Sequence, residues 1–328
     1  MVNVEADVLA GPLLAAEARA AGVVYSMAYG DQPALVAELV DWARATGFRV
    51  VAAGKGTKYL AGYHRITPDE VWDHYGITAA EAKAAGMNSR MFTSFIDGTK
   101  SAIEMAAIAN ACDLKAPISG LSFPPCGVDD LAHVLRPAAQ GGMLEDTGMV
   151  EVIACDERDG RPVFRDLRWG VYVVVEAPND YAAACFRQYG LKTDASGRYA
   201  ALYRPCHLIG LELGISVLSA ALRGEPTGSP RAFNGDVMAT AKRDLDRGET
   251  LDGEGGYCVH GKLAPAADAL ARDALPIGLA HGVALLRSIK AGQVVTWQDV
   301  EIDPDRPAVL ARRDMEARFA PSEQGART

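Results

Sequence analysis

The sequence lacks several features that define large classes of proteins. It has no excess of basic residues: the formal net charge is −9 over 328 residues, which argues against general binding of nucleic-acid phosphates. No apolar run reaches the length of a membrane span, and the first residues lack a basic segment followed by a short apolar core. The six cysteines are scattered without a Cys-x-x-Cys pair, so neither a zinc site nor a disulfide framework is indicated. These absences are typical of a cytoplasmic protein that binds neither nucleic acid nor membrane.

A glycine-rich phosphate turn is also missing where the pattern calls for one. Apolar and β-branched residues predict strands at 1–4, 23–28 and 48–53, with helices over 5–20 and 34–46 between them. This alternation predicts parallel βαβ units and a doubly wound sheet, which usually begins with a strand that runs into such a turn. We therefore expect the chain to open in the second half of a doubly wound domain.

The segment Gly54–Leu60 is expected to leave the last of these strands as a loop with two glycines and two lysines. It is not a P-loop, because the order Gly-Lys-Ser/Thr after a four-residue gap is missing. At the carboxyl edge of a sheet, Lys55 and Lys58 could approach an anionic substrate. The alternative is that the glycines serve only the geometry of a turn.

The stretch 95–106 presents two carboxylates and an ammonium group within about two helical turns. Asp97 and Gly98 predict a turn into a helix that runs to about residue 111, with Thr99 as a candidate N-cap. Lys100 and Glu104 are four residues apart and share one face of that helix. Such a set can polarise a carbonyl or move a proton. The alternative is a solvent-exposed Lys–Glu pair that contributes a few tenths of a kcal/mol.

Residues 207–222 form the longest apolar helix candidate, and Glu212 is embedded in it. A carboxylate in that setting is costly unless it is paired or faces a pocket, so both a site role and a structural ion pair are open. Arg204, just before the helix, is a candidate clamp for an anion.

The last third of the sequence changes character after a Gly/Pro-rich linker at 224–230. Residues 242–251 and 286–295 echo one another, each with a glycine between a charged turn and an apolar strand. The echo predicts a small β-rich module. The charged residues from 304 onward are expected to form a loosely ordered tail.

Three motifs occur in an order that resembles homoserine dehydrogenases: Gly30–Pro33, Gly54–Leu60 and Asp97–Glu104. In that family a glycine–proline turn touches the nicotinamide end of the cofactor, and an Asp-Gly-x-Asp-Ala-Ala-x-Lys helix supplies catalytic Asp and Lys. The C-terminal echo resembles the SAF (β-clip) module. The combination is similar to homoserine-dehydrogenase-like SAF-domain oxidoreductases, which include the second type of 1-deoxy-D-xylulose 5-phosphate reductoisomerase.

Two departures qualify this resemblance. The first half of a Rossmann domain, with its fingerprint, is not found, and Asn3 stands where such enzymes carry an Asn-Lys pair after a strand. The charges on the helix are also exchanged, because Lys100 takes the place of the family's second aspartate and Glu104 that of its lysine. This exchange favours a hydroxy-carbonyl substrate other than homoserine.

The resemblance implies four parts. They are the C-terminal part of a Rossmann domain (1–53), an α+β catalytic domain (54–230), a SAF-like β module (231–303) and the charged tail (304–328).

The resemblance further implies an NAD- or NADP-dependent oxidoreductase, forming a dimer or tetramer, that acts on a small phosphorylated hydroxy-carbonyl compound. Lys100 would polarise the carbonyl, and Asp97 and Glu104 would orient it or bind Mg²⁺ or Mn²⁺. The substrate would be held by Lys55, Lys58, Arg204 and Glu212, and the cofactor by Asn3, Gly30 and Asp31. Two alternatives stay open: homoserine dehydrogenase itself, and a non-catalytic binding or scaffold protein that lacks the cofactor half.

Overall fold

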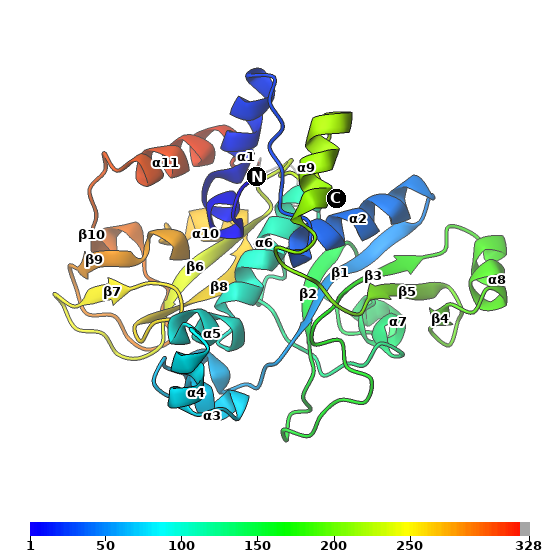
Figure 1. Cartoon of the computed structure of the whole chain (residues 1–328), viewed down its shortest axis with the longest axis horizontal. Helices are drawn as coiled ribbons and strands as arrows, with labels where there is room; N and C mark the ends of the chain where they lie inside the picture. Colours follow the sequence, from blue (N-terminus) through cyan, green and yellow to red (C-terminus); the bar gives the residue numbers. More distant parts are fainter. Residues whose placement is uncertain (322–328) are drawn as a thin grey trace.

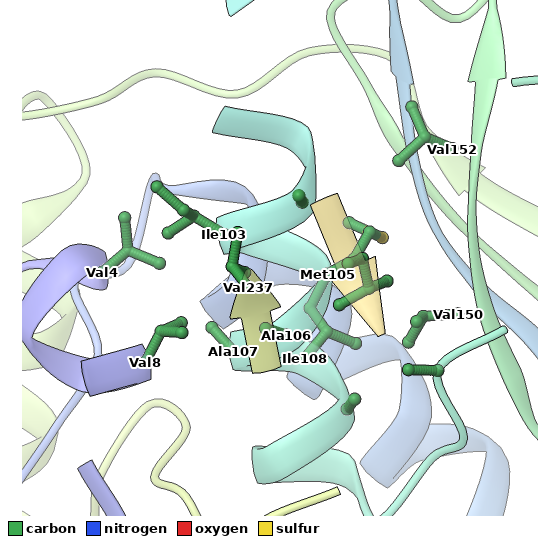
Figure 2. Packing of buried hydrophobic residues seen from close by; sticks show 14 of the residues in the cluster. Val4, Val8, Ile103, Met105, Ala106, Ala107, Ile108, Val150, Val152 and Val237 are labelled. Carbon is green, nitrogen blue, oxygen red and sulfur yellow. The ribbon is translucent and has the colours of Figure 1, made fainter. Parts of the chain in front are cut away.

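Helix α6 (Thr99–Cys112) lies in the middle of the computed structural model, which describes residues 1–321 (Figure 1). Every residue of α6 except Lys100 is buried. On one side Ile103 lies near Val4 of α1, and on the other Met105 lies toward Val152 of β2 (Figure 2). A helix that is buried all round needs small residues where its neighbours approach closely, and α6 is rich in alanine. The two outer parts of the fold therefore meet on this one helix.

A five-stranded mixed sheet covers one side of α6, in the order β2-β1-β3-β5-β4. Only the contact between β1 and β2 is parallel; the other strand pairs are antiparallel. The strands are β1 (Arg49–Thr57), β2 (Met149–Ala154), β3 (Val171–Glu176), β4 (Lys192–Thr193) and β5 (Tyr199–Arg204).

Helices surround this sheet and the start of α6. Helix α2 packs against α6, β1 and β3, whereas α3, α4 and α5 gather below the start of α6 (Figure 1). Within residues 1–321, no helix is both long and apolar enough to cross a membrane. Apart from α6, the helices in the part of the chain that carries this sheet are α1 (Val4–Ala20), α2 (Gln32–Ala45), α3 (Val71–Tyr75), α4 (Ala79–Ala84), α5 (Ser89–Ile96), α7 (Leu131–Val134), α8 (Asp180–Gln188) and α9 (Leu213–Leu218).

The β-rich module on the other side of α6 agrees with the sequence echo. Its elements are β6 (Gly235–Ala241), β7 (Thr250–Asp252), β8 (Val259–Pro265), α10 (Ala266–Ala271), β9 (His281–Leu285) and β10 (Val300–Glu301). The two echoing segments lie side by side and antiparallel, because the backbone groups of Leu245 and Ile289 exchange two hydrogen bonds of 2.9 Å. The repeat is thus a paired structural unit.

The expected loosely ordered tail is wrong for residues 307–319. They form α11 (Pro307–Phe319), which packs along α1 (Figure 1). Arg312 is 1% exposed and makes a bidentate ion pair with Asp236 of β6. A planar guanidinium suits such a buried carboxylate pair. Residues 322–328 of the predicted tail lie outside the described residues.

The expected strands at 1–4 and 23–28 are wrong as well, so residues 1–53 hold only the start of β1 and no parallel βαβ unit. Residue Val4 already begins α1, and the side chain of Asn3 caps this helix by accepting a hydrogen bond of 3.0 Å from the backbone N–H of Ala6. Residues 23–28 belong to no strand, and their backbone bonds singly to Val2, at 3.1 Å from Ser26, and to Gly228, at 2.9 Å from Met27. The chain is a mixed α/β protein, and the doubly wound layout is not what these residues form.

Two further local expectations differ from the structure. The segment expected as a loop after 53 continues as β1 to Thr57, because its glycines let neighbouring chains approach: a Cβ on Gly56 would meet the carbonyl oxygen of Leu167 at 2.0 Å. The long helix expected over 207–222 is only α9 and a π-helical turn at Ser219–Arg223.

Asp7 of α1 gives the fold a pH dependence. Its carboxyl group is 1% exposed and accepts a hydrogen bond of 2.8 Å from the hydroxyl of Tyr25. Burial raises the pKa of Asp7 to about 7. Between about pH 4 and pH 7 the unfolded chain ionises this group while the folded chain keeps the proton, so the free energy of unfolding falls as pH rises.

Between about pH 4 and pH 7, we expect the free energy of unfolding of the parent protein to fall by on the order of 2–4 kcal/mol relative to that of an Asp7→Asn variant. The variant has no carboxyl group at this position to titrate. Urea unfolding at several pH values measures the difference. Glu17→Gln, on the exposed face of the same helix, should leave the parent's pH dependence unchanged. Parallel curves for parent and Asp7→Asn would contradict the assignment.

Candidate active site

A cavity of about 950 Å³ lies beside the N-terminal end of α6. Its walls come from residues 1–5, the end of β1, helix α5, the segment 207–213 and a loop of the β-rich module. Such a volume is at the upper end of ordinary ligand pockets. The cavity is therefore large enough for a small substrate together with part of a coenzyme.

Lys55 and Glu104 form a buried ion pair at this cavity. Lys55 comes from β1 and Glu104 from the second turn of α6, and their side chains are only 7% and 3% exposed. The amide nitrogen of Gln32, oriented toward the carboxylates, lies 3.1 Å from Glu104 Oε1 and 3.3 Å from Asp31 Oδ1. Charges buried this deeply persist only when paired, so the pair fixes β1 and α6 relative to each other.

Lys100 reaches the same cavity from the first turn of α6. Its Nζ lies 2.5 Å from Glu5 Oε1 of α1. Burial opposes the charge of this ammonium group, but the carboxylates of Glu104 and then Glu5 outweigh burial and raise the pKa of Lys100. Lys100 therefore stays protonated at neutral pH and presents a fixed positive charge.

Two further carboxyl groups at the cavity bind protons more readily than usual. Asp31 is the N-cap of α2, where it accepts a hydrogen bond of 2.9 Å from the backbone N–H of Gln32. Burial, and then the charge of Glu104, raises the pKa of Asp31. Burial likewise raises the pKa of Glu254, which comes from the β-rich module. Both are candidates for proton transfer.

Lys58 and Arg168 make another part of the wall positive. Lys58 Nζ lies 3.2 Å from Asp156 Oδ2. The guanidinium of Arg168 lies 4.5 Å from the ring centre of Trp169 and 5.9 Å from that of Tyr75, and within residues 1–321 it makes no ion pair. Aromatic faces hold a guanidinium in place while leaving its donors free, so Arg168 is suited to bind an anionic group.

Most of the residues predicted from the sequence do come together here. Lys100 and Glu104 both face the cavity, as their spacing predicts, but each has its ion-pair partner on another element. The predicted site residues that line the cavity are Asn3, Asp31, Lys55, Lys58, Lys100 and Glu104.

Four predicted residues do not line this cavity. Asp97 lies on the other side of the start of α6, where its carboxylate is 2.8 Å from Lys242 Nζ. Gly30, with a φ of 97°, lies under the chain at Leu208, whose carbonyl oxygen would be 2.8 Å from a Cβ at this position. This close approach, at a left-handed backbone conformation, accounts for the glycine.

Arg204 and Glu212 are the other two, and they form an ion pair with each other. Arg204 also donates a hydrogen bond of 3.1 Å to the hydroxyl of Tyr29. Of the two readings of Glu212, the structural ion pair is the one that the structure supports. The pair holds the segment before α9 against the turn at Tyr29, which itself lines the cavity.

Several residues that line the cavity were not predicted from the sequence. Arg168 and Trp169 form a basic–aromatic pair directly before β3, which is a usable signal for a strand-end site. Glu5 and Glu254 carry no such signal, since they reach Lys100 from distant parts of the chain. Long-range packing alone brings them to α6.

The residues present fit some of the expected bound groups better than others. Within residues 1–321 no three His, Cys, Asp or Glu side chains are grouped so that they could hold a metal ion. The carboxylates of Glu5 and Glu104 are already taken by lysines, so the donor set does not fit Mg²⁺ or Mn²⁺. By contrast, Asp31 and Gln32 offer an acceptor and an amide side by side, which fits the carboxamide of a nicotinamide.

Comparison with known proteins finds two family models that match different parts of the chain. A family model described as the catalytic domain of oxidoreductase DRL matches residues 30–213, more than half of the chain. A SAF-domain model matches residues 237–301, within the module predicted at 231–303. No curated protein matches the chain. The first match includes β1, α5 and α6, which form much of the cavity wall.

Proposed function

Because the chain belongs to the DRL oxidoreductase catalytic-domain family, we propose that it is an NAD(P)-dependent oxidoreductase for a small, phosphorylated hydroxy-carbonyl substrate, similar to a 1-deoxy-D-xylulose 5-phosphate reductoisomerase. The observation that carries the proposal is the position of Lys100. It is the one residue of α6 that is not buried, and it reaches a cavity of about 950 Å³ with its charge held by carboxylates.

Lys100 polarises the substrate carbonyl in this proposal. A fixed ammonium group in a water-poor site stabilises the negative charge that develops on a carbonyl oxygen during reduction. Its raised pKa makes Lys100 a lasting hydrogen-bond donor and a poor general base. The proton that completes an alcohol would then come from a carboxyl group with a raised pKa, and Asp31, which lines the cavity beside Gln32, is our candidate for it.

Glu104 and Asp97 act as positioning residues. Glu104 holds Lys55 at the cavity wall, and Asp97 holds the start of α6 against the β-rich module through Lys242. The phosphate of the substrate would bind at Arg168 and Lys58, which both line the cavity, whereas Arg204 does not line it and is paired with Glu212. Arginine recognises phosphate through paired N–H donors, whereas lysine acts as a point charge.

The nicotinamide end of NADP or NAD would lie against Asp31 and Gln32, close to Tyr29 and Asn3, which also line the cavity. When bound, this group supplies or accepts the hydride. The 328 residues contain no glycine-rich turn for the pyrophosphate. That absence is the observation behind the alternative of another class, a binding or scaffold protein without the cofactor half.

Titration with NADPH and NADH separates the enzyme from the scaffold alternative. A ligand at a concentration 100 times its dissociation constant stabilises the folded state by about 2.7 kcal/mol, which raises the melting temperature by several degrees. We expect such a rise together with enhanced nicotinamide fluorescence for one of the two cofactors. If both cofactors leave the melting temperature and the fluorescence unchanged, the oxidoreductase proposal fails for this chain.

Two substrates then separate the enzymatic alternatives. Consumption of NADPH with 1-deoxy-D-xylulose 5-phosphate, followed at the nicotinamide absorbance band, supports the reductoisomerase-like reading. Reduction of NAD⁺ or NADP⁺ with homoserine supports homoserine dehydrogenase. The exchange of charge at Lys100 and Glu104 favours the first outcome.

We also propose that the protein is a cytoplasmic homo-oligomer. Large apolar side chains are exposed along the segment before and through α9; Leu211, Leu218 and Leu222 are 82%, 58% and 77% exposed. Such clustered apolar exposure is typical of an interface. Light scattering coupled to size-exclusion chromatography measures the mass, and a monomer of 34.7 kDa at micromolar concentration would contradict this part of the proposal.

A further inference from the structure

A second cavity, of about 350 Å³, lies on the opposite side of the start of α6. It shares no lining residue with the candidate active site. Its walls come from the 3₁₀ turn Tyr63–Arg65, the segment 119–123, the start of α6 and strands β6 and β8. The cavity therefore lies where the catalytic domain meets the SAF domain.

The charge inside this cavity is positive, although the whole chain has a formal net charge of −9. Asp97 is the one carboxylate among its lining residues, and Lys242 neutralises it at 2.8 Å. The remaining donors of Lys242 are used by the carbonyl oxygens of Ile66 and Gly256, each at 2.8 Å. Lys242 and Asp97 therefore add no net charge to the cavity.

Arg65 and Lys262 supply the uncompensated charge. They lie on different walls, Arg65 in the 3₁₀ turn and Lys262 on β8, and within residues 1–321 neither forms an ion pair. Both side chains are exposed. Two cations on the walls of one cavity, where the one carboxylate is already paired, attract an anion. This arrangement indicates a site for an anion.

Two histidines add hydrogen-bonding groups to the cavity. The ring centres of His64 and His260 are 5.6 Å apart. Burial lowers the pKa of His260 to about 4, so this ring is neutral at physiological pH and presents one N–H and one acceptor nitrogen. Beside them, Tyr59 and Phe123 stack with ring centres 3.8 Å apart and provide an apolar wall.

We propose that this cavity binds a small phosphomonoester as a second ligand, separate from the substrate. The two cations match the double negative charge of a phosphate, the imidazole N–H groups can donate to its oxygens, and the aromatic wall can cover a short carbon skeleton. A volume of about 350 Å³ has room for a phosphate with a few carbon atoms but not for a dinucleotide. The proposal does not depend on the oxidoreductase activity.

Histidine ring NMR tests the proposal directly, because the chain has only six histidines. His64 and His260 line the second cavity, whereas His207 lines the first. We use glycerol 3-phosphate and inorganic phosphate as probes on the full chain. The expected result is a saturable shift of the His64 and His260 resonances, with a dissociation constant in the millimolar range or below.

Paired variants locate the binding. Arg65→Gln combined with Lys262→Gln should weaken binding more than tenfold, since both cations are lost. Arg247→Gln removes an exposed arginine of the same module outside the cavity and should bind like the parent. Shifts confined to His207, no saturation, or equal affinities of the double variant and the Arg247→Gln control would each overturn the proposal.

Discussion

Replacing Lys100 with methionine should lower kcat/KM by about two to four orders of magnitude, because the positive charge that polarises the carbonyl is lost. Methionine keeps most of the side-chain volume of lysine, so the packing at the start of α6 is retained. The fold should tolerate the change: Glu104 keeps its partner Lys55, and Glu5, left alone, is 33% exposed and can be hydrated. Steady-state oxidation of NADPH with 1-deoxy-D-xylulose 5-phosphate measures the effect.

Two further variants show whether the charge or its position matters. Lys100→Arg keeps the charge but places it differently, and we expect intermediate activity. Lys83→Met, on the exposed surface of α4, removes a lysine away from the cavity and should keep the parent's kcat/KM. A Lys100→Met protein with near-parental turnover would remove Lys100 from the reaction.

The pH profile gives an independent readout. Because the pKa of Lys100 is raised above the ordinary 10.5, this group should not contribute an alkaline limb below that pH. Asp31 has a raised pKa. If kcat/KM depends on its proton, the profile should therefore change at a pH above the usual pKa range of a carboxyl group. Asp31→Asn should abolish that change, whereas Lys100→Met should move it.

Local spacing predicted the helix that carries Lys100 and Glu104, both of which line the cavity. The separation of Lys100 and Glu104 places both on one face of a helix, and this holds because helical geometry depends only on nearby residues. Their actual partners, Glu5 and Lys55, are distant in sequence and come from other elements. Spacing within one segment carries no information about contacts with distant segments. It therefore suggested an ion pair between Lys100 and Glu104, whereas each of them pairs with a residue of another element.

The errors in the first 60 residues have an equally physical origin. Short apolar runs such as 1–4 and 23–28 suit a buried strand, a helix or covered extended chain, and periodicity does not separate these over so few residues. Asn3, followed by the acidic Glu5, is an N-cap signal that was available and that outweighs the apolar run. The segment after 53 was misassigned because glycine is common in turns, whereas here it permits close chain crossing.

Asp97 shows that the same motif holds residues that line the candidate active site and a residue that forms a structural ion pair. Its position next to Lys100 suggested a shared catalytic role, but the turn at Gly98 directs it to the other side of the helix start. There its side chain is 0% exposed, and that of Lys242 is 2% exposed. The pair joins the catalytic domain to the SAF domain at the base of the helix that carries Lys100.

Lys242→Met should therefore lower the free energy of unfolding by about 3–5 kcal/mol, because it leaves the carboxylate of Asp97 buried without a partner. Asp97→Asn removes the unpaired buried charge, so the double variant should recover a large part of the free energy of unfolding that Lys242→Met alone loses. Urea unfolding of the parent, both single variants and the double variant measures the coupling. Lys290→Met breaks the exposed pair with Asp244 and should leave the free energy of unfolding nearly unchanged. If the effects of Lys242→Met and Asp97→Asn simply add, the two residues do not form a buried pair, and the base of α6 is held by packing alone.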